Sequence, residues 1–240
     1  MDNKEKIAFV KDYIIRKIVK GYIVGDLKRL LSVKIIPNHD GNCNFPIALY
    51  VLTSMSFLGY LIAERELIND WERINAYIDG MFEEEDKAKI EPHRTEFTNK
   101  FRNGLAHEFF PKMAGISRVN SELMTLSKKG YWVLDADILA NMLIKSTENL
   151  ENAAKNEAFC LRMFSRYNEI QKRNLELKDR PSVTTTNVVR SSGATTTTLP
   201  YESNQGDVGP NISRSKGDTG VSGLKEYMES IKKKNNNENQ

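Results

Sequence analysis

The stretch FPIALYVLTSMSFLGYLIA, residues 45–63, carries no charged side chain and constrains the interpretation of the whole chain. It is close to the length of about twenty apolar residues that a membrane-spanning helix needs. Small or hydroxylated residues interrupt its middle, and Glu64-Arg65-Glu66 end it abruptly. A helix that is apolar on most sides also occurs at the centre of a bundle, where neighbouring helices cover it. We therefore expect a core helix, with a membrane span as the alternative.

Segments with helical periodicity on both sides of this stretch would supply the covering helices. Before it, apolar residues recur at helical spacing over residues 7–19, and the pattern extends as far as Ile35 before the helix breakers in 37–41. After it, residues 67–82 form a second amphipathic run, and Pro92 begins a helix that reaches about His107. We expect these segments to pack around residues 45–63.

A change of periodicity after Pro111 predicts a small β element. Short apolar runs on either side of Lys128-Lys129-Gly130 indicate a β-hairpin. Asp135 is placed to cap a long last helix, whose inner face contains Ile138, Leu139, Leu143, Leu150, Ala154, Phe159 and Met163. The expected fold is mainly α, an up-and-down helical bundle with a small β-hairpin insertion.

The composition changes near residue 180 and divides the chain into a helical domain, 1–180, and a tail, 181–240. The tail is rich in Thr, Ser, Gly and Asn, so it buries too little apolar surface to offset the entropy lost on ordering. We expect it to be disordered. Near residues 222–234, an apolar helical stripe precedes three lysines, which fits a short amphipathic helix that binds a partner or a helical patch without a role.

Charge and cysteine usage limit the classes of function. The net charge of +3 is too small for a protein that binds nucleic acid by electrostatics alone, so any RNA contact would be local. Cys43 and Cys160 form no CxxC pair, which argues against a zinc site and fits reduced thiols in a cytosol. The first residues contain no apolar signal core. The carboxylates of residues 83–86 are interpreted as a solvated face or a helix end. We expect a cytoplasmic protein without a metal or cofactor.

The block FRNGLAHE, residues 101–108, contains the candidate chemistry. On an ideal helix three polar residues lie away from its apolar stripe: Arg102, Asn103 and His107. Arg102 and His107 are roughly 140° apart on such a helix, which is too far to grip one phosphate. A second copy of the helix, related by two-fold symmetry, would bring the His of each copy to the Arg of the other.

This block resembles the motif of the HEPN superfamily, in which an Arg, usually followed by a polar residue, precedes a His by a few positions. HEPN proteins are small helical bundles, and many are ribonucleases. The resemblance covers about ten residues in detail and residues 1–175 in the order of helices. It implies a homodimeric, metal-independent endoribonuclease in which Arg102, Asn103 and His107 are the catalytic residues and RNA is the substrate. It also implies a role in a toxin–antitoxin or phage-defence system. The apolar stripe near the end of the tail would then bind an antitoxin or another protein partner.

The three residue types suit RNA cleavage. RNA supplies its own nucleophile, the 2′-hydroxyl next to the scissile phosphate. An imidazole with an ordinary pKa of about 6.5 exchanges this proton at neutral pH. A guanidinium offers a planar fork to the phosphate oxygens as negative charge develops. An Asn amide can orient the imidazole or the phosphate, and the resemblance implies a 2′,3′-cyclic phosphate product.

A non-catalytic role is the alternative. An Arg beside a carboxylate is usually a salt bridge, and the sequence offers Glu91, Glu96 and Glu108 as partners of Arg102. The chain would then be a helical dimerisation or partner-binding module. Two further histidines are interpreted as incidental, because neither has a companion motif: His39 between helices and His93 in the first turn of the motif helix.

Overall fold

The computed structural model describes most of the predicted helical domain, namely residues 1–36, 42–108, 111 and 113–178, with side chains for all of these except 98–99, 106–108 and 176–178. The chain divides into two units, Met1–Ile170 and Gln171–Gln240. The predicted tail, 181–240, and its candidate helix near 222–234 lie outside the described residues. The described part is mainly helical with a small β-sheet, as predicted.

The charge-free stretch forms α3 (Asn44–Ile62), a core helix. Six of its large apolar side chains are fully buried: Ile47, Val51, Leu52, Met55, Leu58 and Leu61. α3 is long and apolar enough to cross a membrane, but 67% of that apolar window is buried within the protein, as in the core helix of a soluble protein. The structure therefore favours the core helix over the membrane span.

The first helical segment runs without interruption from α1 (Asn3–Phe9) through η1 (Val10–Val24), which has wide π-type turns, to α2 (Gly25–Leu31). Asp2 and Glu5 begin it with a capping box in which each side chain accepts a backbone N–H at 2.8 Å. Its apolar face is buried. The helix ends at Leu31, earlier than the pattern reaching Ile35 indicated, and the breakers in 37–41 lie outside the described residues.

Arg118 explains where the first helix ends. Its guanidinium, with a side chain only 2% exposed, donates to the carbonyl oxygens of Leu31 at 2.9 Å and Val33 at 3.1 Å. These carbonyls have no intrahelical partner at a helix C-terminus. Asp137 completes the cluster by accepting from Arg118 Nε at 2.7 Å and from its Nη2 at 3.3 Å. We call this cluster the Arg118 clamp.

The next two helices follow the core helix in the chain. α4 (Asp70–Met81) lies within the amphipathic run predicted for 67–82, and Asn69 caps it by accepting the N–H of Glu72 at 2.9 Å. α5 (Glu84–Ile90) was not predicted as a helix. Its acidic first turn suits a helix N-terminus, because carboxylates there oppose the positive end of the helix dipole.

The acidic block of residues 83–86 lies at a helix end, one of the two interpretations of the sequence, but it is not wholly solvated. Glu84 and Glu85 are exposed, but Asp86 is buried. The ammonium group of Lys145 lies 3.6 Å from a carboxylate oxygen of Asp86 and 2.5 Å from one of Glu83. This pair of contacts ties the start of α5 to Lys145.

The helix predicted from Pro92 to His107 is helical throughout but not regular. A 3₁₀ turn, η2 (Glu91–His93), leads into α6 (Arg94–Glu96), π-type turns form η3 (Phe97–Arg102), and α7 (Asn103–Glu108) follows. A π-type turn contains more residues than an α-turn, so each residue advances by less than the 100° that an ideal helix gives. The motif therefore spans a change of helical geometry.

The predicted hairpin is present, and a third strand joins it. β2 (Met124–Leu126) pairs antiparallel with β3 (Trp132–Asp135), and the chain turns at Gly130 with φ of 78°. β1 (Ala114–Ser117) pairs parallel with β3 and gives the order β1-β3-β2. β1 was not predicted, because four residues of intermediate burial show no alternation of apolar and polar side chains.

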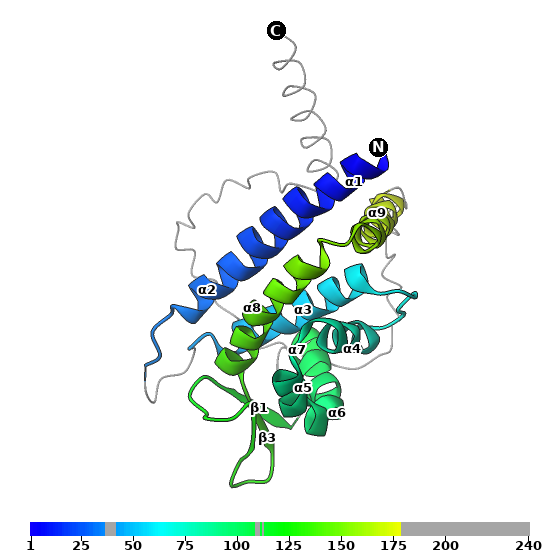
Figure 1. Ribbon diagram of the computed structural model, residues 1–240. Coiled ribbons are helices and arrows are strands. Elements are labelled where there is room, and N and C mark those ends of the chain that lie inside the picture. The colour runs from blue at the N-terminus through cyan, green and yellow to red at the C-terminus, as the bar shows by residue number, and fades with distance from the viewer. Residues whose placement is uncertain (37–41, 109–110, 112, 179–240) are drawn as a thin grey trace, which may run out of the picture. The chain divides into compact units, whose positions relative to one another are not determined.

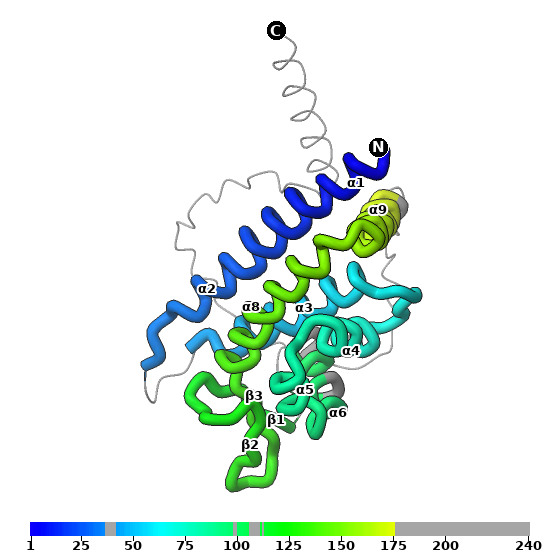
Figure 2. The backbone as a smooth tube through the Cα atoms, viewed as in Figure 1, coloured from blue at the N-terminus to red at the C-terminus, as the bar shows by residue number. Residues whose placement is uncertain are grey.

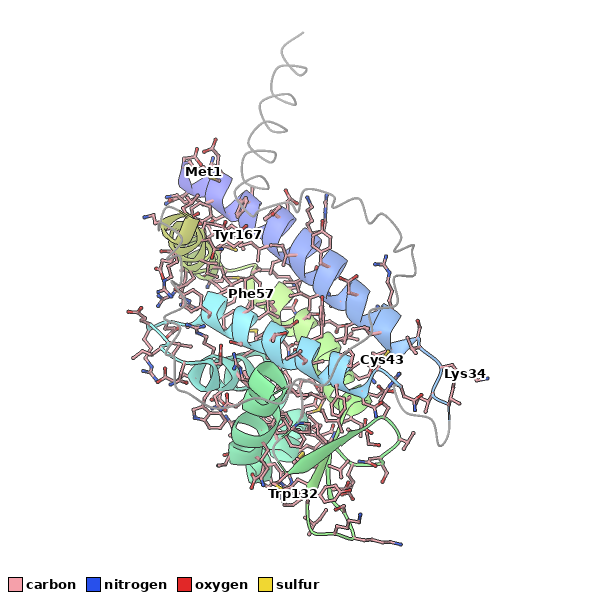
Figure 3. All side chains as sticks on the ribbon, turned by 180° about the vertical axis from the view of Figure 1, so that it is seen from behind. Met1, Lys34, Cys43, Phe57, Trp132 and Tyr167 are labelled. Carbon is pink, nitrogen blue, oxygen red and sulfur yellow. The ribbon has the colours of Figure 1, made fainter. Side chains whose placement is uncertain are left out.

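The predicted last helix is two helices, α8 (Ala136–Ala153) and α9 (Glu157–Lys178). Asp135 caps α8, as predicted, by accepting the N–H of Ile138 at 2.9 Å, and burial raises the pKa of its carboxyl group. Asn156 caps the start of α9 by accepting the N–H of Phe159 at 3.1 Å. The break lets α9 pack against the first helix, where the Tyr167 ring lies 5.5 Å from that of Phe9 (Figure 3).

The helices of the first unit are arranged around α3 and α8. The first helix lies on one side of α3 and α8, and α4 to α7 lie on the other (Figure 1). The sheet follows α7 and leads directly into the start of α8 (Figure 2). α3 and α4 approach most closely at Gly59, where an added Cβ would lie 1.8 Å from the carbonyl oxygen of Arg73.

Gly59→Ala is expected to lower the free energy of unfolding by about 3 kcal/mol or more, because backbone rather than a flexible side chain blocks the added methyl group. Gly21→Ala is the matched control, since its Cβ would lie 3.5 Å from the nearest atom, an ordinary contact. Urea denaturation followed by circular dichroism measures both. Equal stability of the two variants would contradict a close contact between α3 and α4.

Candidate active site

The motif residues lie where η3 meets α7. Phe97, Phe101 and Leu105 anchor this segment, because each is at most 3% exposed. These are the residues of the apolar stripe that the helical projection predicted. Arg102 is the last residue of η3, Asn103 is the first of α7, and His107 follows one turn later.

Arg102 is more covered than its expected place on the polar arc indicated. Its side chain is 14% exposed, and its guanidinium forms an ion pair with the carboxylate of Asp70, the first residue of α4. The acid partners considered from the sequence were wrong where they are described: Glu91 instead binds Arg94 at 2.5 Å. Asp70 is far from the motif in sequence, so no helical spacing could have indicated it.

Asp70 is itself held by two other groups. Ser56 Oγ, on α3, donates to Asp70 Oδ1 at 2.5 Å, and Arg73 Nη1 lies 3.6 Å from the same oxygen. The other carboxylate oxygen accepts from Arg102. One carboxylate thus joins two guanidinium groups and a hydroxyl from three different elements. Charge-assisted hydrogen bonds of this kind fix geometry more firmly than neutral ones.

Arg73 extends the network toward α9. Its Nε and Nη2 donate to the carbonyl oxygen of Leu67 at 3.3 and 3.2 Å, and its guanidinium lies 4.9 Å from the centre of the buried Tyr60 ring. The guanidinium of Arg166, from α9, lies 5.6 Å from the same ring. Tyr60 donates its hydroxyl to Glu169 at 2.8 Å. Arginine stacks well on aromatic faces, so the Tyr60 ring holds both guanidinium groups, and Arg166 also forms an ion pair with Glu169 at 3.0 Å. We call Arg73, Arg102 and Arg166 the arginine cluster.

The other two predicted catalytic residues are placed only in part. Asn103 is half-buried, and its side chain forms no hydrogen bond to another described residue. His107 belongs to α7, but its side chain lies outside the described residues. The structure thus places Arg102 and Asn103 side by side, and the approach of the His107 imidazole stays a prediction.

The two other histidines were interpreted as incidental. The His93 ring packs against that of Trp132 with a centroid distance of 4.7 Å, and it lines a cleft of about 520 Å³ beside Leu123 and Met124. The interpretation of His93 as incidental to chemistry stays a prediction, but the side chain has a packing contact. His39 lies outside the described residues.

A larger cleft of about 790 Å³ lies along the outer side of α4 and includes Trp71, Glu72 and Asp79. It lies on another face of α4 from Asp70 and Arg73, which contact η3 and α3. Its carboxylates have basic partners: Glu72 lies 3.8 Å from Arg65 and Asp79 lies 2.6 Å from Arg94. Within the described ranges, no three His, Cys, Asp or Glu side chains gather as metal ligands.

Asp70, Ser56 and Arg73 are the residues that sequence reasoning missed. The available signal was the start of α4. Asn69 followed by Asp70 and Glu72 is a typical N-terminal pattern, in which a cap residue precedes acids in the first helical turn. That signal predicts a helix N-terminus but not the neighbour that the acid faces.

Asp70→Asn is expected to lower the free energy of unfolding by about 1–3 kcal/mol, because it leaves two partly buried guanidinium groups without their shared carboxylate. Asp12→Asn is the matched control, since Asp12 is 53% exposed and lies 3.8 Å from Arg16. Such a surface pair contributes about 0–1 kcal/mol. Urea denaturation compares the two variants. An equal loss in the free energy of unfolding would mean that Asp70 contributes no more to stability than a surface carboxylate.

Comparison of the chain with protein-family models, with characterised proteins and with solved structures gave no match. The family and the chemistry therefore rest on the residues and on the geometry around Arg102.

Proposed function

We propose that the chain is a HEPN-type bundle that acts as a metal-independent endoribonuclease, with Arg102, Asn103 and His107 as its catalytic residues. The observation that carries the proposal is the fixed position of Arg102. The Asp70 ion pair holds its guanidinium, whose side chain is 14% exposed, and Asn103 and His107 follow one and five residues later in the sequence. A fixed cation beside a residue that transfers protons is the arrangement that phosphodiester cleavage requires.

In the proposed reaction the 2′-hydroxyl attacks the adjacent phosphorus and the bond to the 5′-oxygen of the next nucleotide breaks. His107 accepts the proton of the 2′-hydroxyl as general base. Arg102 stabilises the negative charge that grows on the phosphate oxygens. The departing 5′-oxygen takes up a proton from water, so the products are a 2′,3′-cyclic phosphate and a 5′-hydroxyl end.

Asp70 acts in this scheme as a positioning residue. A guanidinium has five N–H donors, so it can bind a carboxylate and a phosphate oxygen at the same time. Because Ser56 and Arg73 also bind Asp70, the carboxylate is not free to swing toward an incoming phosphate. A group that is fixed before the substrate binds needs no reorganisation in the transition state.

The proposed assembly is a two-fold homodimer in which the His107 of each subunit meets the Arg102 of the other. In an isologous interface, each contact between two residues occurs twice. Two equivalent sites would therefore form across one interface. We place the enzyme in the cytoplasm, as a toxin or defence effector whose tail binds an antitoxin or another protein.

A non-catalytic dimerisation or partner-binding module is the second candidate, and one observation favours it. The ion pair between Arg102 and Asp70 links η3 to α4 and would stabilise the fold without any substrate. A structural role of Arg102 and a catalytic role predict different effects of substitution, and the following experiment separates them.

Purified protein incubated with total RNA in EDTA is expected to cleave it and to leave 2′,3′-cyclic phosphate ends. His107→Ala is expected to lower the rate by about 10²–10⁴-fold, and Arg102→Lys by about 10²-fold, because Lys keeps the charge but loses the planar fork. His39→Ala and Arg65→Ala, a surface arginine with a 76% exposed side chain, are the matched controls. A parent protein without activity, or folded variants as active as the parent, would favour the binding module.

Mixing the two inactive variants tests the shared site. In a dimer of His107→Ala with Arg102→Lys, one site has lost both residues and the other is intact. Exchange of subunits at equal amounts should restore about one quarter of the parental activity. Complementation is absent if each subunit uses its own Arg102 and His107.

A further inference from the structure

The charges of the first 180 residues are segregated along the sequence. Residues 1–34 contain nine Lys and Arg against four Asp and Glu, a net charge of +5, whereas residues 35–180 contain 19 against 22, a net charge of −3. The small net charge of the whole chain therefore conceals a basic helix on an acidic body.

The basic side chains of this segment face the solvent. The exposed ones are Lys4, Lys11, Arg16, Lys17, Lys28, Arg29 and Lys34, and we call them the basic face. Their helix buries its apolar side against the core, where Phe9, Val10, Ile14, Val19 and Leu27 have no exposed surface. The arrangement leaves charge, and little apolar surface, on the outer side of the first helix.

Much of this charge is not neutralised within the protein. Arg16 lies 3.8 Å from Asp12 and Arg29 lies 3.0 Å from Asp26. By contrast, four lysines form no ion pair with any acid among the described residues: Lys4, Lys11, Lys28 and Lys34. Cations spread along a surface without acidic partners create a positive potential that attracts a polyanion.

The dimensions suit an extended polyanion rather than a small one. Lys34 lies beyond the end of the first helix opposite to Met1 (Figure 3). At the α-helical rise of about 1.5 Å per residue, Lys4 and Lys28 would be separated by roughly 35 Å, and the wider turns of η1 shorten this length. Tyr22 lies within this length and is 54% exposed. An exposed aromatic ring within a basic track is a stacking platform for an unpaired base.

We propose that the basic face binds the phosphate backbone of a single-stranded RNA, outside the catalytic motif. The choice of RNA over other polyanions rests on the proposed ribonuclease function. An anionic membrane is the less suitable partner, because a helix that lies on a bilayer inserts its apolar side, and here that side is buried in the core. The basic face would hold a long substrate while the motif cleaves it.

The test measures the binding of a fluorescent single-stranded RNA in which every 2′-hydroxyl is methylated, so that it cannot be cleaved. The triple variant Lys4→Gln/Lys11→Gln/Lys28→Gln is compared with the parent by fluorescence anisotropy over a range of salt concentrations. Each phosphate contact contributes about 0.7 to the slope of log K against log salt on a single strand, so the slope is expected to fall by about 2. Tyr22→Ala is expected to weaken binding about tenfold.

The control is the triple variant Lys128→Gln/Lys129→Gln/Lys155→Gln, which removes the same charge from exposed positions elsewhere. An equal loss of affinity in both triple variants, or none in either, overturns the proposal. So does parent protein that binds vesicles of phosphatidylcholine and phosphatidylserine but not the RNA.

Failure of this inference is distinguishable from failure of the proposed function. If the parent protein cleaves RNA, and the Lys4/Lys11/Lys28 variant binds the methylated RNA as tightly as the parent does, only the proposal of the basic face is overturned. Parent protein that binds through the basic face but cleaves no RNA overturns the nuclease and leaves the basic face. Where both hold, the same variant raises the KM for long RNA and leaves the cleavage of a few-nucleotide substrate unchanged.

Discussion

The close approach of α3 and α4 at Gly59 is the constraint on which the candidate site depends. A backbone carbonyl occupies the space that any other side chain would need, so the two helices pack at the distance that only glycine allows. This approach places the first turn of α4 beside Ser56 and Tyr60. Asp70 and Arg73 are then mostly covered, with side chains 29% and 24% exposed. The position of Arg102 follows from the packing of two helices that carry no part of the motif.

The arginines around Asp70 and Tyr60 share their binding partners. One carboxylate serves Arg73 and Arg102, and one ring serves Arg73 and Arg166. Arg73 and Arg102 thus depend on the same acid, whereas Arg166 has its own partner in Glu169, at 3.0 Å. Such an arrangement is costly to assemble, because like charges repel across short distances where little water intervenes.

The sequence predicted the helices well where periodicity or composition was strong. The charge-free stretch became α3, the capping role of Asp135 was confirmed, and the hairpin around Gly130 is present. Predictions failed where the signal was short or distant. α5 is only two turns long, and nothing local marked the break after Ala153.

Long-range pairs in the site were beyond sequence reasoning for a related reason. Arg102 and Asp70 are 32 residues apart, and the π-type turns of η3 shift the phase on which a helical projection relies. The apolar stripe tolerated that shift, because large rings at Phe97 and Phe101 fill the core over a range of angles. The prediction for the polar side of the same segment was more sensitive to this shift, since an ion pair depends on the direction in which the guanidinium points.

The Arg118 clamp has a consequence for the order in which the chain assembles. Its hydrogen bonds join residues 85 and 87 positions apart, from the end of the first helix to the segment after β1. Closing so long a loop is entropically unfavourable until the intervening elements have packed. The first helix can acquire its local hydrogen bonds early, but its C-terminal carbonyls stay solvated until α3 to α7 are in place. We therefore expect the clamp to form late in folding, when residues 31–33 and 118 are brought together.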